Sequence, residues 1–202
     1  EVAACYEARV SGNLPGLPVL PIQYADYAYW QRQQLQGKTL ERKLEYWRKQ
    51  LNDVPVLEFP TDYPRSDTSD DHGAHVPFSL TTAETRKLKA LSMRAGVTLF
   101  TVLLTALGIV LQRYTGQTDI MTGTVVANRD RAEVEKLIGF FVNALPLRLD
   151  LTGNPNLFEL LKRSGKVVEE AYNHSDLPFD LLVQDLKLPR DASRNPVFQV
   201  SL

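Results

Sequence analysis

Four leucines in the second half of the chain alternate with polar residues or proline. Leu145, Leu147, Leu149 and Leu151 occupy every second position of this run. Because successive side chains of a β-strand point to opposite faces of a sheet, this period of two predicts a strand with one face on a hydrophobic core. A strand needs a second layer to cover that face, so the rest of the chain must supply one.

Segments with helical spacing surround this strand and are expected to form that layer. Thr81 and Glu84 have the spacing of a capping box, and Asp176 is expected to cap a short helix with Pro178 in its first turn. Further helices are predicted over residues 21–32, 40–51, 98–114 and 157–172, and further strands over 76–80, 120–126 and 197–202. The fold class predicted is therefore α/β, a mixed sheet with packed helices.

Composition excludes several classes of partner. The formal net charge of the 202 residues is −1, which gives no electrostatic attraction to nucleic acid or to an anionic membrane. The most apolar stretch, residues 97–111, is shorter than the roughly 20 residues that span a bilayer and indicates a buried helix. Cys5 is the single cysteine, so an internal disulfide and a thiolate metal cluster are excluded, and a cytoplasmic location is expected.

The two ends of the chain are expected to be cuts within a longer protein. Residues 1–10 resemble the tail of a helix and are followed by a run rich in glycine and proline, without the features of a signal peptide. Residues 197–202 alternate apolar and polar side chains without a closing turn. We expect a lobe that is incomplete at both ends.

Self-contained chemistry is scarce. The histidines are His72, His75 and His174, and no two of them form a zinc-binding or Cys-His arrangement, so no metal site is predicted. Glycine motifs for nucleotide binding and the serine elbow of hydrolases do not occur. The Asp71-His72-Gly73 run is interpreted as part of a solvated loop.

Two residues outside such motifs are candidates for a site. Asn143 follows a bulky apolar run, where an amide either satisfies backbone groups or faces a cavity, because an unpaired buried amide costs a few kcal/mol. His174 precedes the short helix and is either a structural hydrogen-bonding group or a partner for a polar ligand. The Arg190, Asp191 and Arg194 cluster reads as a solvated turn.

Several motifs occur in a fixed order along the chain. They are YADYAYWQR at 24–32, LEYWRKQL at 44–51, PTDYPR at 60–65, IGFFVN at 138–143, HSDLPFD at 174–180 and RDASRNP at 190–196. In this order they resemble the second half of a condensation domain of nonribosomal peptide synthetases, a family similar in fold to chloramphenicol acetyltransferase. The paired-histidine HHxxxDG motif of that family is absent from this chain.

The resemblance implies a function in peptide-bond formation. In the family, two lobes form a tunnel, and donor and acceptor peptidyl carrier proteins deliver phosphopantetheine-bound substrates from opposite ends. The amine of the acceptor attacks the donor thioester, and a histidine of the first lobe assists. This chain is therefore expected to be inactive alone, and its implied partners are the carriers, the N-terminal lobe and an adjacent adenylation domain.

Carried onto this sequence, the resemblance places Asn143 in the substrate channel. Residues 1–20 would be an inter-lobe linker and 21–202 the lobe, with a floor-loop region at 123–136 and a latch-adjacent segment at 190–202. Further channel or inter-lobe candidates are Asn128, Arg129, Asp130, Phe140, Phe141, His174, Arg190 and Arg194. Alternatives are an epimerisation or heterocyclisation relative, and a non-catalytic module that recruits a partner protein.

Overall fold

The computed structural model describes residues 1–63, 72–187 and 195–202, and the chain divides into two compact units. The first unit contains Glu1–Gln36 and Arg129–Phe141, and the second contains Gly37–Asn128 and Val142–Leu202. Each has its own cluster of buried apolar side chains.

A small antiparallel sheet lies at the centre of the second unit. Strands β1 (Asp119–Val126) and β2 (Asn143–Asp150) are antiparallel, with Gly123 opposite Pro146. Ser201 forms a parallel bridge to Gly123 on the other side of β1. The α/β class and both of these predicted strands are confirmed, and the only parallel pairing among the described residues is this isolated bridge.

Gly123 allows the C-terminal segment to lie against β1. Its N–H donates to the Val200 carbonyl, and its own carbonyl accepts from the Leu202 N–H. A Cβ atom at this position would lie 2.2 Å from the Phe198 ring, so a larger residue would require that ring to move. Both backbone groups of Gly123 therefore bond to the C-terminal segment and not to β2, so Gly123 and Pro146 are a non-hydrogen-bonded pair of the antiparallel ladder. The nitrogen of Pro146 points away from β1, and its missing N–H costs no hydrogen bond between the two strands.

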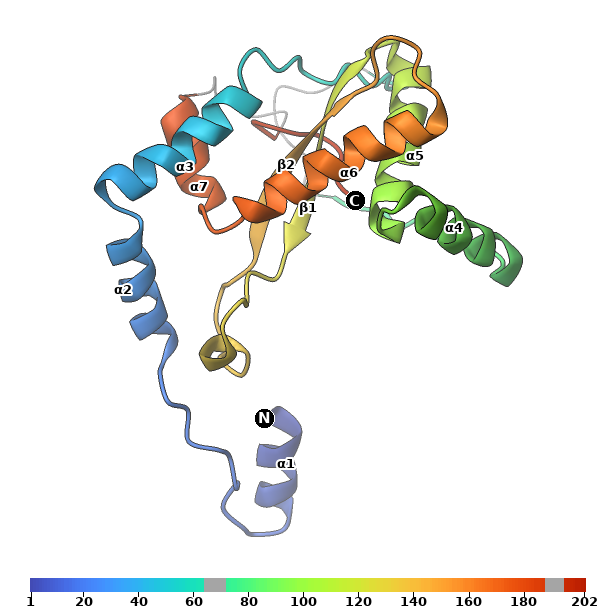
Figure 1. Ribbon diagram of the computed structural model, residues 1–202. Helices are drawn as coiled ribbons and strands as arrows, with labels where there is room; N and C mark the ends of the chain where they lie inside the picture. The colour runs from blue at the N-terminus through green and yellow to red at the C-terminus, as the bar shows by residue number, and fades with distance from the viewer. Residues whose placement is uncertain (64–71, 188–194) are drawn as a thin grey trace. The chain divides into compact units, whose positions relative to one another are not determined.

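Helices α5 (Leu99–Thr115) and α6 (Leu157–Asn173) contact the sheet as the second layer, and Figure 1 shows α6 running along the two strands. Helix α4 (Thr82–Ala95) packs against α5 and α6. The predicted capping box of Thr81 and Glu84 is confirmed at the start of α4, and Asn156 and Glu159 form another ahead of α6. A Cβ at Gly108 of α5 would lie 2.8 Å from the Leu149 side chain of β2. The glycine therefore allows α5 to pack closely on the sheet.

Helices α3 (Gly37–Gln50) and α7 (Phe179–Leu186) lie side by side in Figure 1. Arg48 joins them through two hydrogen bonds, of 2.7 and 2.6 Å, to the carboxylate of Asp185. Trp47 is 2% exposed and brings α3 into the main core. The alternating leucines predicted to face that core are buried there, namely Leu145, Leu147, Leu149 and Leu151.

The first unit is held by aromatic side chains. It contains α1 (Val2–Val10), α2 (Tyr24–Gln34) and the short helix η1 (Ala132–Val134). Tyr27 and Phe141 are buried together, with ring centroids 4.8 Å apart. A Cβ at Gly139 would lie 2.2 Å from the Tyr24 ring, so the glycine lets the 129–141 segment approach α2.

Three sequence predictions are wrong. Residues 76–80 form no strand, and Val76 and Phe78 are almost fully exposed because no neighbouring strand pairs with them in the described part of the chain. Residues 197–202 reduce to the single bridge at Ser201. Asp176 does not cap α7, since its carboxylate binds Lys43.

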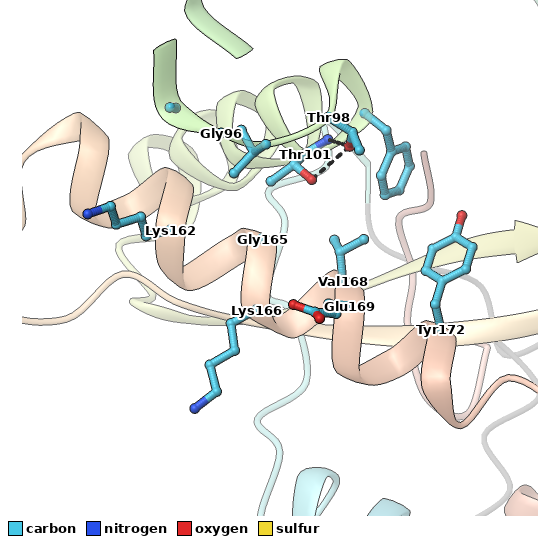
Figure 2. A pocket seen from close by; sticks show the side chains of 12 residues that line it. Gly96, Thr98, Thr101, Lys162, Gly165, Lys166, Val168, Glu169 and Tyr172 are labelled. Carbon is cyan, nitrogen blue, oxygen red and sulfur yellow. Dashed lines mark hydrogen bonds between the residues drawn. The ribbon is translucent and has the colours of Figure 1, made fainter. Parts of the chain in front are cut away.

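A cavity of about 770 Å³ opens between the α4–α5 corner and α6. Figure 2 shows Thr98 and Thr101, whose hydroxyls are 2.9 Å apart, facing Gly165 and Val168 of α6, with Lys162 and Lys166 at its rim. The cavity is lined by none of the predicted site residues.

Within the described ranges no single helix is long and apolar enough to span a membrane. Helices α4 and α5 reach that length and composition only together, across a bend of 101°.

Candidate functional site

Asn143 is the first residue of β2 and lies 7% exposed. Its Nδ2 donates to the Ser175 carbonyl at 2.7 Å and to the Leu177 carbonyl at 2.8 Å. Its Oδ1 accepts from the Phe179 N–H at 2.9 Å. Both amide hydrogens and one oxygen lone pair are therefore used by the connection between α6 and α7.

This connection, residues 174–178, is also held from α3. Lys43 forms an ion pair with Asp176 at 2.5 Å. The indole Nε1 of Trp47 donates to the His174 carbonyl at 3.3 Å. The connection thus lies between the start of β2 and the middle of α3, with polar contacts to both.

His174 ends α6 and stacks on an aromatic ring. Its imidazole lies parallel to the Tyr46 ring, with centroids 3.6 Å apart and an angle of 5° between the planes. Its Nδ1 lies 2.8 Å from the Glu170 carbonyl, which makes Nδ1 the donor. One ring nitrogen is therefore committed to the helix, and Nε2 is the atom left for a polar partner.

Tyr46 is not a candidate general base. Burial, and secondly the negative charge of Glu170, raise its pKa to about 12. The phenol therefore stays protonated at neutral pH and serves as a stacking surface for His174.

Arg129, in the first unit, organises the segment that follows it. Its Nη1 donates to the carbonyls of Val134 at 2.5 Å and Leu137 at 2.9 Å, and lies 3.4 Å from that of Glu135. Its guanidinium lies 4.2 Å from the centroid of the Phe141 ring. These contacts hold residues 129–141 as a compact loop.

Adjacent phenylalanines differ in exposure. Phe141 is 3% exposed and packs edge-on against Tyr24, with centroids 5.2 Å apart. Phe140 is 78% exposed, although its carbonyl accepts a hydrogen bond from the Tyr24 hydroxyl at 2.9 Å. Of the two, only the Phe140 side chain is available to a ligand or to another lobe.

The remaining candidates are scattered. Asn128 has a left-handed backbone with φ of 50° and is half-buried, and Asp130 is exposed. Arg190 and Arg194 lie outside the described residues. The structure brings Asn143 and His174 to one connection in the second unit, and Arg129 and Phe141 to one loop in the first.

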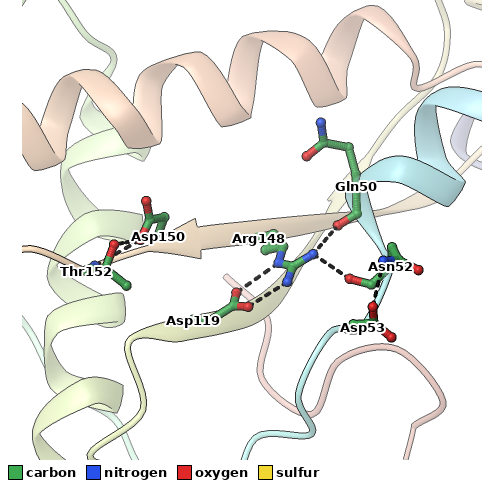
Figure 3. Close-up of polar contacts among 7 residues, drawn as sticks. All are labelled: Gln50, Asn52, Asp53, Asp119, Arg148, Asp150 and Thr152. Atoms are coloured by element: carbon green, nitrogen blue, oxygen red, sulfur yellow. Dashed lines mark hydrogen bonds and ion pairs between the residues drawn. The ribbon is translucent and has the colours of Figure 1, made fainter.

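The other end of β2 contains a residue that the sequence analysis did not single out. Arg148 makes two hydrogen bonds, of 2.9 and 2.6 Å, to the Asp119 carboxylate of β1. Its Nη1 also donates to the carbonyls of Gln50 at 3.0 Å and Asn52 at 2.8 Å, where α3 ends (Figure 3). An arginine on the polar face of an otherwise leucine-rich strand was the signal that could have identified it.

No self-sufficient catalytic arrangement is present among the described residues. No group of three potential ligands is placed to hold a metal ion there. His174 has a backbone carbonyl and a phenol ring as its neighbours, rather than a nucleophile. The polar groups at the start of β2 bind backbone groups and fix the shape of the chain.

Comparisons with known proteins give one consistent result. The family model for the condensation domain matches residues 1–202. The chain is 47% identical over 201 residues to a linear gramicidin synthase of Brevibacillus parabrevis, covering 99% of this chain and 3% of that protein. It is 40% identical over 202 residues to phosphinothricin tripeptide synthetase PhsC of Streptomyces viridochromogenes, covering all of this chain and 19% of that protein.

The fold is likewise similar to that of a solved relative. The X-domain from teicoplanin biosynthesis aligns with a TM-score of 0.92 and 31% identity, over 99% of this chain and 46% of that one. The chain therefore spans less than half of the solved domain and a small part of each synthetase. The family resemblance seen in the motifs is confirmed: this chain belongs to the condensation-domain family.

Proposed function

We propose that the chain forms the second-lobe part of a condensation domain that joins two carrier-bound substrates by an amide bond. The nitrogen of an acceptor aminoacyl group attacks the carbonyl carbon of a donor aminoacyl or peptidyl thioester. The C–N bond forms, the C–S bond breaks, and the thiol of the donor phosphopantetheine leaves with the proton lost by the amine. The match of the family model over all 202 residues is the observation that carries this proposal.

The proposed contribution of this chain is positioning rather than proton transfer. His174 has one ring nitrogen bound to a helix carbonyl, which leaves it a single free ring nitrogen for proton transfer. The catalytic histidine is proposed to come from the other lobe of the same domain. The exposed Phe140 and the loop held by Arg129 are proposed to face that lobe or the channel.

The proposed partners are donor and acceptor carrier proteins, an N-terminal lobe and an adenylation domain. Their support is the family match and the synthetase relatives. Phosphopantetheine would arrive as the arm of each carrier rather than as a group held by this chain. The cytoplasmic location stays a prediction.

The test is a condensation assay with the domain that contains this chain. The domain is mixed with a donor carrier and an acceptor carrier, each loaded with an aminoacyl group, and the acceptor-bound product is identified by mass spectrometry. An amide product that requires both loaded carriers is expected, and the 202-residue chain alone is expected to give none. A product one water lighter would indicate heterocyclisation, and solvent deuterium at the α-carbon without amide formation would indicate epimerisation.

Recruitment of a protein partner is the second candidate. It is favoured by the structural similarity to the X-domain of teicoplanin biosynthesis, which has also been solved in complex with OxyB. A domain that forms no product from loaded carriers, yet binds a protein of its own biosynthetic system, would support this alternative over condensation.

A further inference from the structure

The Asn143 amide has no donor left for a substrate. Its two N–H groups are directed to the Ser175 and Leu177 carbonyls, and its oxygen accepts the Phe179 N–H. The side chain is 7% exposed. Its three partners are all backbone groups, so the amide substitutes for the backbone pairing that the connection lacks.

The first turn of α7 depends on this amide. Pro178 occupies the N-cap position and makes no side-chain cap hydrogen bond. The N–H of Phe179, the first residue of α7, is satisfied by Asn143 from 36 residues away. Removing the amide would leave one N–H and two carbonyls without these partners.

The residue type fits this role closely. Asparagine supplies two donors and an acceptor on one short planar group. Aspartate offers no N–H for the two carbonyls, and alanine offers neither donor nor acceptor. The connection is meanwhile fixed on its other side by α3, through Trp47 and Lys43. A change at Asn143 would therefore shift the connection relative to an anchored helix.

We propose that Asn143 is a positioning residue of the condensation reaction, which acts by holding residues 175–179 and the start of α7 and does not touch the substrate. The proposal rests on the proposed function. The family resemblance implies that Asn143 lines the channel; in this proposal Asn143 acts on the reaction only through the segment that it holds.

The test compares Asn143→Ala, Pro178→Ser and the double variant in the domain that contains this chain. A serine at the N-cap accepts hydrogen bonds from the second or third amide of a helix, which restores order to α7 without replacing the Asn143 amide. We expect Asn143→Ala to lower the rate of amide formation about tenfold or more. The rate of Pro178→Ser alone is the reference for the double variant. The double variant should recover at least about threefold of the lost rate.

Hydrogen exchange at the Phe179 amide supplies the structural readout. Its exchange should accelerate about tenfold or more in Asn143→Ala, because its acceptor is lost. Asn173→Ala, an exposed asparagine at the end of α6, is the matched control and should change neither rate nor exchange.

Each outcome decides the proposal. Loss of rate with unchanged exchange at Phe179 would show that Asn143 acts other than by holding the start of α7, and would overturn the proposal. Restored order of α7 without recovery of rate in the double variant would rule out the start of α7 as the part through which Asn143 acts. Full activity in Asn143→Ala despite faster exchange would show that the connection does not serve the reaction. An unmodified domain that forms no amide would refute the proposed function itself, and with it any role of Asn143 in condensation.

Discussion

The two ends of strand β2 are tied to the rest of the second unit in opposite ways. At the start, buried Asn143 binds three backbone groups with a neutral amide. Near the end, half-exposed Arg148 binds the Asp119 carboxylate and two carbonyls where α3 ends. Both ends join the strand to a distant segment, but one uses neutral dipoles in the core and the other uses charge near solvent.

The difference predicts which end is fragile. A buried polar group that loses its partner costs about 1–3 kcal/mol, because water cannot replace the bond. Loss of the partner of a charge near the surface costs less free energy, since water and salt screen that charge. Asn143 should therefore contribute more to stability than Arg148, although Arg148 makes more bonds.

The largest effect is expected for Asn143→Asp. It places an acceptor opposite the Ser175 and Leu177 carbonyls and removes both donors, so we expect a loss of about 3–5 kcal/mol in the free energy of unfolding. Urea unfolding at neutral pH measures it. Since protonation of the new carboxylate restores one donor, the loss should shrink in acid, and a loss no larger than that of Asn173→Asp would contradict this expectation.

An intermediate effect is expected for Arg148→Met. The variant keeps the apolar stem but leaves Asp119 and the two carbonyls of Gln50 and Asn52 without their donor, for a loss of about 2 kcal/mol. Asp119→Asn should cost less, because Arg148 keeps both carbonyls. A double-mutant cycle that shows no coupling between the two side chains would rule out the ion pair as the tie.

A small, pH-dependent effect is expected for Thr152→Val. Hydrogen bonds from Thr152, first from its hydroxyl, and the charges of Arg163 and Arg148 lower the pKa of Asp150. A carboxyl whose pKa is lowered by folding stabilises the protein above its unfolded pKa of about 3.9, and this contribution is lost as pH falls through the folded value.

The variant should therefore be less stable than the unmodified chain by under about 0.5 kcal/mol at pH 7, because Asp150 is exposed. The difference should decline below about pH 4. Thermal unfolding across this pH range measures it, and a difference that grows in acid would have the wrong sign.

The sequence predicted the helices and strands better than the hydrogen bonds and ion pairs that join them. The alternating leucines and the Thr81–Glu84 capping box are local patterns, and both were confirmed. Asp176 was assigned to a cap because it precedes a proline at a helix start, but an anchored lysine in α3 competes for its carboxylate. Local spacing does not reveal such a partner, which lies 133 positions away.

The role of Asn143 was likewise not predictable from local sequence. The sequence left open whether Asn143 satisfies backbone groups or faces a cavity, since only the fold brings residues 175–179 to the start of β2. The predicted strand at 76–80 failed for the related reason that alternation specifies a strand only where another strand lies beside it.

Hydrogen exchange of Asn143→Ala and Arg148→Met, measured side by side on the same chain, tests the central claim that the two ends of β2 are tied independently. We expect faster exchange within residues 175–181 in the first variant and around residues 50–54, where α3 ends, in the second, with each segment unaffected by the other change. Acceleration of both segments in both variants would show that the strand responds as one unit and would contradict the claim.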